Sequence, residues 1–177
     1  MTAQPKHNIS GQRANDLLVA GLPLADFYID GNVKIVINGS WNKEVIIDNC
    51  IIEKFDGSVT QFDKPVKFTN SHFKDCAFVF SYFIQGLFID NCTFGKYLDF
   101  QAGGHNQSGH AVIIQNSTFL SFVNFFDCWF NGQVLICNNK FDKGTNIESL
   151  RQLISFDIPS TIHDNIGLTN VEAECAD

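Results

Sequence analysis

An eight-residue phrase returns along this chain, and its fifth residue is always asparagine. Its copies are Val45–Ile52, Val66–Phe73, Leu87–Phe94, Val112–Phe119 and Val134–Phe141, and their starts are 21, 21, 25 and 22 residues apart. A repeat of this period is a supersecondary unit that stacks on copies of itself, because one copy alone cannot bury its apolar face. The sequence therefore predicts a solenoid.

Each copy has the pattern of two short strands joined by a bend. Its first and third residues are apolar, which is the two-residue period of a strand with one buried face. Asparagine tolerates the left-handed backbone region better than any residue except glycine, so it predicts the bend. In stacked copies the bend amides would lie about 4.8 Å apart and could bond to one another. The predicted asparagine ladder consists of Asn49, Asn70, Asn91, Asn116 and Asn138.

The residues after the bend predict two further inward rows. A narrow row contains Cys50, Ser71, Cys92, Ser117 and Asn139, and a wide row contains Ile52, Phe73, Phe94, Phe119 and Phe141. A third wall is predicted from Phe78, Phe80, Phe83, Phe100, Phe122, Phe125 and Phe130. Because cysteine alternates with serine in the narrow row, we expect small core residues with free thiols and hence a reducing, cytoplasmic location.

The phrase Val-x-Ile-x-Asn-x-x-Phe resembles the strand–bend–strand unit of pectate-lyase-like β-helices. A second resemblance, to pentapeptide-repeat proteins, comes from phenylalanines every five residues, each preceded two positions earlier by a small or slim residue; they are Phe68, Phe73, Phe78, Phe83 and Phe88. Both resemblances cover roughly residues 33–141. They imply an all-β fold, a right-handed parallel β-helix of about six or seven coils with short helical caps at its ends. The five-residue register slips after Asn91, so we expect a pentapeptide-like or irregular β-helix.

The ends of a solenoid need covers, since a terminal coil exposes both a strand edge and an apolar interior. Residues 1–32 are the predicted N-terminal cap, with a short helix over Ser10–Ala20. Residues 33–168 are the predicted β-helix, and the acidic tail 169–177 is expected to fray.

A second helix is predicted at about 146–155, inside the β-helix region. Thr145 and Glu148 form a capping box, and one helical face carries Ile147, Leu150, Leu153 and Ile154. We expect this helix to pack across or beside the last coils.

Charge and hydropathy argue against two classes of partner. The formal net charge is −7, and the only arginines are Arg13 and Arg151. Binding to a nucleic-acid backbone needs clustered Lys and Arg, so direct nucleic-acid binding is not expected. The first residues are polar and no apolar run approaches the roughly 20 residues of a membrane span, so neither a signal peptide nor a membrane association is expected.

The longest insertion, residues 101–110, is a polar loop and a candidate functional loop. It carries His105 and His110, but no nearby carboxylate or cysteine completes a metal site. We therefore expect no metal or cofactor and interpret the loop as solvated or in contact with a partner.

Catalysis is not expected, because glycoside-cleaving β-helices need a cluster of carboxylates, or calcium ligands with a basic residue. The third wall offers Asp56, Asp99, Asn124 and Asp127, which lie on different coils, and the last three are weak candidates. Trp41 and Trp129 could stack on sugars, although packing is the favoured reading for both.

The second residue of each phrase points outward by alternation, and this row is a candidate interface. It reads Ile46, Lys67, Phe88, Ile113 and Leu135, so four of the five residues are apolar on a face expected to meet solvent. The row is expected either to lie beneath a terminal segment, to form a homodimer, or to bind a foreign protein.

These observations favour a non-enzymatic module that presents a rigid, acidic β-helix to a protein partner. The pentapeptide resemblance suggests one version, in which the protein mimics duplex DNA and inhibits a DNA-processing enzyme such as a topoisomerase. That version requires a line of carboxylates, whereas Asp48, Asp90 and Glu53 alternate with uncharged residues. The alternative is a carbohydrate-binding or polysaccharide-modifying β-helix.

Overall fold

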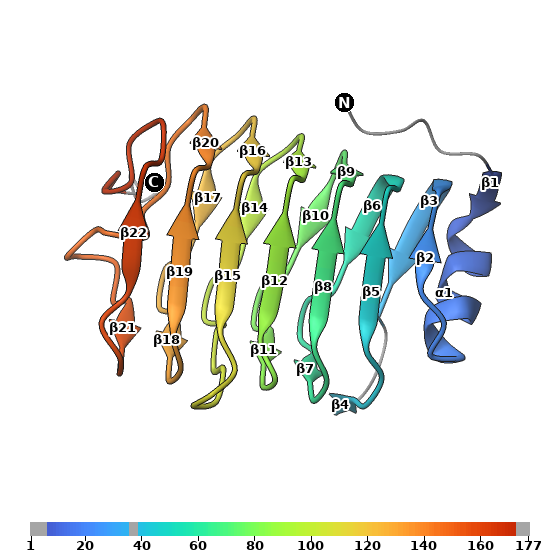
Figure 1. Ribbon diagram of the computed structural model, residues 1–177, viewed down its shortest axis with the longest axis horizontal. Coiled ribbons are helices and arrows are strands. Elements are labelled where there is room, and N and C mark those ends of the chain that lie inside the picture. The colour runs from blue at the N-terminus through green and yellow to red at the C-terminus, as the bar shows by residue number, and fades with distance from the viewer. Residues whose placement is uncertain (1–6, 36–38, 173–177) are drawn as a thin grey trace, which may run out of the picture.

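The copies of the phrase stack in parallel, each bent at its asparagine. The computed structural model describes residues 7–35 and 39–172. These residues form a parallel β-solenoid of about seven turns, as the repeat predicts (Figure 1). In this part of the chain no helix has both the length and the apolar character needed to cross a bilayer.

The front face, which looks toward the viewer in Figure 1, is a seven-stranded parallel sheet. Its strands are β2 (Leu24–Ala25), β5 (Val45–Asp48), β8 (Val66–Thr69), β12 (Leu87–Asp90), β15 (Val112–Gln115), β19 (Val134–Cys137) and β22 (Thr161–His163).

The upper and back faces share one ten-stranded sheet. The upper strands are β1 (His7–Ser10), β9 (His72–Phe73), β13 (Thr93–Phe94), β16 (Thr118–Phe119) and β20 (Lys140–Phe141), and the back strands are β10 (Cys76–Ala77), β14 (Leu98–Asp99) and β17 (Val123–Asn124). Two longer strands, β3 (Phe27–Lys34) and β6 (Ile51–Asp56), run across both faces. In β6, for example, Ile52 pairs with β9 and Phe55 pairs with β10.

The lower face completes each coil. Its strands are β4 (Ser40–Trp41), β7 (Gln61–Phe62), β11 (Tyr82–Phe83), β18 (Trp129–Phe130) and β21 (Ser155–Phe156). They form a three-stranded and a two-stranded sheet, and Gly104 joins these through bridges to Tyr82 and Trp129.

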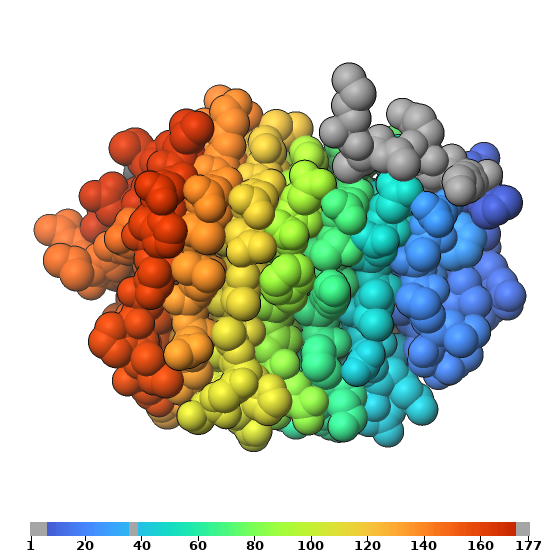
Figure 2. Space-filling model, viewed as in Figure 1, coloured from blue at the N-terminus to red at the C-terminus, as the bar shows by residue number. Residues whose placement is uncertain are grey.

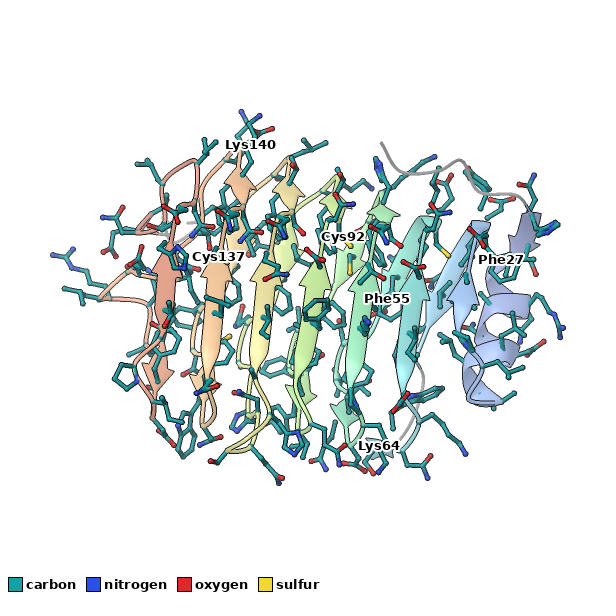
Figure 3. The ribbon with its side chains drawn as sticks, in the orientation of Figure 1. Phe27, Phe55, Lys64, Cys92, Cys137 and Lys140 are labelled. Carbon is teal, nitrogen blue, oxygen red and sulfur yellow. The ribbon has the colours of Figure 1, made fainter. Side chains whose placement is uncertain are left out.

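The interior consists of the predicted rows, in which each residue contacts its equivalents on neighbouring coils. The wide row is a stack of parallel rings: Phe73 to Phe94, Phe94 to Phe119 and Phe119 to Phe141 have centroids 5.0, 5.1 and 4.9 Å apart. Phe55 and Cys92 lie inside the ribbon, whereas Lys64 and Lys140 lie at its rim (Figure 3). Such rings each bury a large apolar area, so the stacks supply much of the driving force for folding.

The predicted third wall is correct for five of its seven phenylalanines. Phe78, Phe83, Phe100, Phe125 and Phe130 are buried. Phe80, by contrast, is 50% exposed, and Phe122 is only partly buried. Phe80 occupies a corner between the back and lower faces, where the side chain points away from the interior.

The cysteines of the narrow row are buried free thiols, as predicted. Cys50 and Cys92 lie among the serines of that row, and their Sγ atoms contact the carbonyl oxygens of Asp48 and Asp90 at 3.3 and 3.4 Å. Burial raises the pKa of the Cys50 thiol to about 11 and that of Cys92 to about 12. These thiols are therefore protonated and unreactive at neutral pH. Cys175 lies outside the described residues.

The backbone conformation of the bend is as predicted, but most of the side-chain hydrogen bonds of the ladder asparagines do not join one asparagine to the next. All five ladder asparagines have a left-handed φ between 50° and 56°. One amide-to-amide contact is present, from Asn91 Nδ2 to Asn70 Oδ1 at 2.8 Å. Other ladder amides donate to aspartates of the preceding coil instead: Asn49 to Asp26, Asn70 to Asp48 and Asn116 to Asp90. A carboxylate is the stronger acceptor, and the aspartates lie within reach because they precede or occupy the bend.

The N-terminal end of the solenoid is covered by α1 (Gly11–Val19), which lies where the sequence predicts a helix (Figure 1). Ser10 Oγ accepts a hydrogen bond from Arg13 N at 3.2 Å and caps the helix. Ala14 and Leu18 are fully buried against the first coil. Gly11 is required here, since a Cβ would lie 2.3 Å from the carbonyl oxygen of Asn32.

The helix predicted at 146–155 is absent, and this prediction was wrong. Thr145 instead pairs with Val123, and Asn146 Oδ1 accepts from Phe125 N at 2.7 Å. Leu153 has a left-handed φ of 55°, which no α-helix contains, and Leu150 is fully exposed. The local helical signals are outweighed because the segment gains more backbone and side-chain contacts by continuing the coil.

The acidic tail is described only as far as Glu172. Its first residues are held to the last coil, because Glu148 N donates to Thr169 O at 2.8 Å and Val171 N donates to Thr145 O at 3.0 Å. The remainder of the predicted frayed tail lies outside the described residues.

A second corner, between the back and lower faces, also has left-handed backbone, but asparagine does not occupy it. Its residues are Val59, Phe80, Ala102, Asp127 and Leu153, with φ between 51° and 56°. Left-handed backbone is strained for branched side chains, and Val59 is also 70% exposed, so it gains little from packing.

We expect Val59→Asn to raise the free energy of unfolding by about 1 kcal/mol, because asparagine adopts this backbone with less strain. Urea denaturation of the two proteins would measure the difference. Val79→Asn changes the same residue type at a position with ordinary backbone and serves as the control. An unchanged or lower stability for Val59→Asn, relative to this control, would show that the corner is not strained.

Candidate functional site

The predicted outward row forms one continuous line on the front face. Ile46, Lys67, Phe88, Ile113 and Leu135 are direct neighbours on successive strands. The four apolar side chains are half-buried by their neighbours, while Lys67 is exposed and places its Nζ 5.6 Å from the Phe88 ring centroid. We call this line the front row.

Because the C-terminal helix does not form, it does not cover the front row. In Figure 2 the successive coils of the front face are open to the viewer from β5 to β22. The N-terminal helix α1 packs against β1, β2 and β3 at the end of the solenoid instead. Within the described residues, the front row therefore faces solvent.

A pocket of about 260 Å³ lies at the C-terminal end of the front row. Its lining includes Ala111, Ile113, Leu135, Ile158 and Pro159. The pocket is therefore mainly apolar, and it continues the front row toward the last coil.

The candidate loop is packed more firmly than its composition predicts. Asn106 is fully buried and its Nδ2 donates to His110 O at 2.7 Å and to Gln133 O at 3.1 Å. Residues 107–109 form the exposed part of the insertion. The His105 ring contacts the lower-face rings of Tyr82 and Trp129, whereas His110 follows the exposed turn.

The weak catalytic candidates have structural contacts. Asp99 Oδ1 accepts from Gln101 N and from Asn124 Nδ2, both at 2.9 Å. Asn124 is buried and in turn accepts from Asn146 Nδ2 at 2.8 Å. Asp127 is exposed in the strained corner. Asp99 and Asn124 therefore belong to a hydrogen-bonded ladder with Asn146 on the back face, and Asp127 lies at the corner beside it.

The lower face brings together an aromatic strip that sequence reasoning missed. The rings of Tyr82 and His105 have centroids 4.1 Å apart, and those of His105 and Trp129 are 5.6 Å apart. We call Tyr82, His105 and Trp129 the lower strip. A recurring dipeptide, an outward aromatic followed by an inward Phe at 82–83 and 129–130, is the sequence signal that could have indicated it.

Gly104 creates the space for His105. It occupies the strand position between Tyr82 and Trp129 with φ 99°, and a Cβ there would lie 2.5 Å from Trp129 O. The next residue, His105, also has left-handed backbone and donates its N–H to Trp129 O at 2.6 Å. Burial lowers the pKa of His105, so its ring is neutral at neutral pH.

Trp129 is held by its indole N–H. Nε1 donates to Asp157 Oδ1 at 2.8 Å, and Asn131 Nδ2 donates to the other oxygen of that carboxylate at 2.9 Å. The hydrogen bonds from Trp129 and Asn131 lower the pKa of Asp157, which is therefore ionised. Trp129 remains 48% exposed, whereas Trp41, the other predicted sugar-stacking candidate, is only 6% exposed and belongs to the core.

A separate polar cluster joins successive coils on the upper face. Lys74 Nζ lies 2.5 Å from Glu53 Oε1, and the Tyr28 hydroxyl donates to the same carboxylate. The hydrogen bond from Lys74 lowers the pKa of Glu53. These groups are largely exposed, so the pair contributes little to stability. Across residues 7–35 and 39–172, no three His, Cys, Asp or Glu side chains gather as a metal site requires.

Comparison of the chain with protein-family models, with curated proteins and with solved structures gives no match. The parallel solenoid is thus established by the structure alone.

Proposed function

We propose that this protein is a non-enzymatic binding module whose front face contacts a protein partner. The observation that carries the proposal is the front row, in which apolar side chains lie in register on neighbouring strands and meet solvent. Isolated apolar residues at the surface are normal on any protein, but a contiguous line of half-buried ones that still reach solvent is a candidate contact surface.

The composition of the front row suits a protein. Phe88, Ile113 and Leu135 supply an apolar centre, and the pocket beside Leu135 can receive an anchoring side chain. Lys67 interrupts the row and, on binding, requires an acidic group opposite it. The strands are fixed by their neighbours on both sides, so the surface loses little conformational entropy when it binds.

We also propose that the coil from Val66 to Gly86 is of the pentapeptide-repeat kind. Its inward side chains alternate between small residues and phenylalanine: Phe68, Ser71, Phe73, Cys76, Phe78, Ser81 and Phe83. This proposal concerns architecture, because one repeat fold can host many functions.

Acidic mimicry of DNA receives less support than apolar binding. The last residues of the front strands β5 to β19 form a neighbouring row, which reads Asp48, Thr69, Asp90, Gln115 and Cys137. Only two of these five residues are carboxylates, and Thr69 separates them. Asp48 and Asp90 also accept hydrogen bonds from the asparagine ladder. The proposal therefore rests on the apolar row.

Site-specific photo-crosslinking tests the proposal. A benzophenone amino acid would replace Ile113 on the front face or, as the control, Thr118 on the upper face of the same coil. After irradiation in expressing cells, we expect a discrete protein adduct from position 113 and none from position 118. Equal labelling from both positions, or none from either, would refute the front face as an interface.

The mass of the adduct identifies the type of partner. A product of twice the chain mass indicates a second copy, and Ile113→Glu should then convert a dimer into a folded monomer in sedimentation velocity. A product of another mass indicates a foreign protein, and Leu135→Glu should abolish it while the chain stays folded.

A further inference from the structure

We propose that the lower strip binds a neutral glycan chain that lies along the solenoid axis. The lower strip and the front row lie on different faces of the solenoid. The glycan proposal therefore does not depend on the protein-binding function proposed for the front row. The inference rests on the geometry of Tyr82, His105 and Trp129 and on the polar groups beside them.

The indole of Trp129 forms a fixed and accessible aromatic surface. Trp129 pairs with Ser155 on the next coil, but its Nε1 reaches Asp157, which directly follows β21. The ring is therefore directed toward the neighbouring coil and past its own strand partner. A free surface tryptophan would have no reason to keep one orientation, whereas this one is held by an ionised carboxylate and remains about half exposed.

The strip continues toward the N-terminus without a break. His105 fills the space above Gly104 and contacts both neighbouring rings. Tyr82 and Trp129 lie two coils apart, which is about 10 Å at the spacing of parallel strands. That length matches a disaccharide unit, so one extended glycan could place consecutive sugar rings along the strip.

The chemistry of the strip selects a sugar over other ligands. The C–H face of a pyranose is apolar and packs on aromatic rings, while its hydroxyl groups need hydrogen-bond partners at the ring edges. Asp157 and Asn131 supply such partners beside Trp129, and the Tyr82 hydroxyl supplies one at the other end. A purely apolar ligand would leave these groups unpaired, at a cost in affinity.

Charge selects a neutral glycan over an acidic one. Asp157 is ionised beside Trp129. Beyond Tyr82, hydrogen bonds from Ser40 and Gln61 lower the pKa of Asp63, which is ionised as well. Lys64 lies next to Asp63, at the far end from Trp129. His105 is neutral at neutral pH because burial lowers its pKa. A polyuronate would therefore meet two carboxylates and a neutral ring, with the cation of Lys64 at the end far from Trp129.

Tryptophan fluorescence offers a direct test, because the chain has two tryptophans and Trp41 is buried. The full chain would be titrated with cellohexaose, mannohexaose and xylohexaose as neutral probes, and with a galacturonate hexamer as the acidic probe. We expect at least one neutral hexaose to shift the emission with a Kd between about 1 μM and 1 mM, and the galacturonate to bind at least about ten-fold more weakly. Trp41→Phe should keep the response.

Calorimetry of variants shows whether the strip is the site. Trp129→Ala should weaken binding by at least about ten-fold, and Tyr82→Ala by less; Thr118→Ala on the upper face should leave it unchanged. Circular dichroism and thermal melting check that each variant is folded. If Trp129→Ala does not fold, the double variant Trp129→Phe/Tyr82→Ala takes its place. The proposal is overturned if no neutral hexaose binds at about 10 mM, if galacturonate binds more tightly, or if folded strip variants bind normally. A protein adduct crosslinked from position 129 would equally overturn it, by assigning the strip to a protein partner.

Discussion

Phe94→Ala is expected to lower the free energy of unfolding by about 3–5 kcal/mol. Phe94 is 1% exposed and lies between Phe73 and Phe119, with ring centroids at 5.0 and 5.1 Å and ring planes 6° apart in both pairs. Removing its ring leaves a cavity in the middle of the stack. The neighbouring rings cannot close the cavity, because each is fixed by the strand pairing of its own coil.

Chemical denaturation, monitored by circular dichroism, measures this effect. Phe80→Ala is the matched control, since Phe80 is 50% exposed in the strained corner and loses no buried contact of comparable size. We expect the control to change stability by less than about 1 kcal/mol. Similar losses in the two variants would mean that the interior stack is not the main source of stability.

The stack illustrates what the sequence predicts well. The inward rows are encoded by two-residue alternation in each copy, and the repetition fixes which residues of different coils meet. All five copies have a large apolar residue in the wide row, so the sequence alone places Phe94 between Phe73 and Phe119. Left-handed bends were equally predictable, because the residue type carries its own backbone preference.

The errors arise where local signals oppose long-range pairing. Thr145 and Glu148 form a plausible capping box, yet Thr145 pairs with Val123 and the segment completes a coil. The gain from stacking on the preceding coil depends on residues more than 20 positions away, so no local pattern reveals it. For the same reason the alternation rule misplaced Phe80, which follows the interior pattern only until the chain turns at the corner.

Of the two candidate sites, the sequence predicts the front row but not the lower strip. The front row follows from alternation within one phrase, and strand pairing places its five residues side by side. Its role as an interface stays a prediction. The lower strip depends on the insertion at 101–110. In that coil Gly104 pairs with Tyr82 and Trp129, so His105 stands where the other two coils have Phe83 and Phe130. Alternation predicts an inward residue at that position, and the His105 ring instead contacts the outward rings. The hydrogen bond from Trp129 to Asp157 joins two coils that pair at Ser155, a residue for which the sequence predicts a helix instead of a strand.

The energetic role of the bend is best tested at its centre. Asn91→Val is expected to lower the free energy of unfolding by roughly 2–3 kcal/mol, from the strain of a branched residue at φ 53° and the loss of one hydrogen bond. The hydrogen bond is the one that Asn91 Nδ2 donates to Asn70 Oδ1 at 2.8 Å. Because Val59 already occupies left-handed backbone, the fold should survive the substitution and only its stability should fall.

Asn91→Gly separates the two contributions. Glycine adopts the left-handed backbone without strain but cannot donate to Asn70, so this variant should lose only about 1 kcal/mol. The difference between the two variants in urea denaturation therefore measures the strain at the bend. If the two variants lose the same free energy of unfolding, the asparagine contributes mainly through its amide hydrogen bond. If the valine variant loses more, as we expect, the bend is specified mainly by the backbone preference of asparagine, and the amide contact adds a smaller stabilisation.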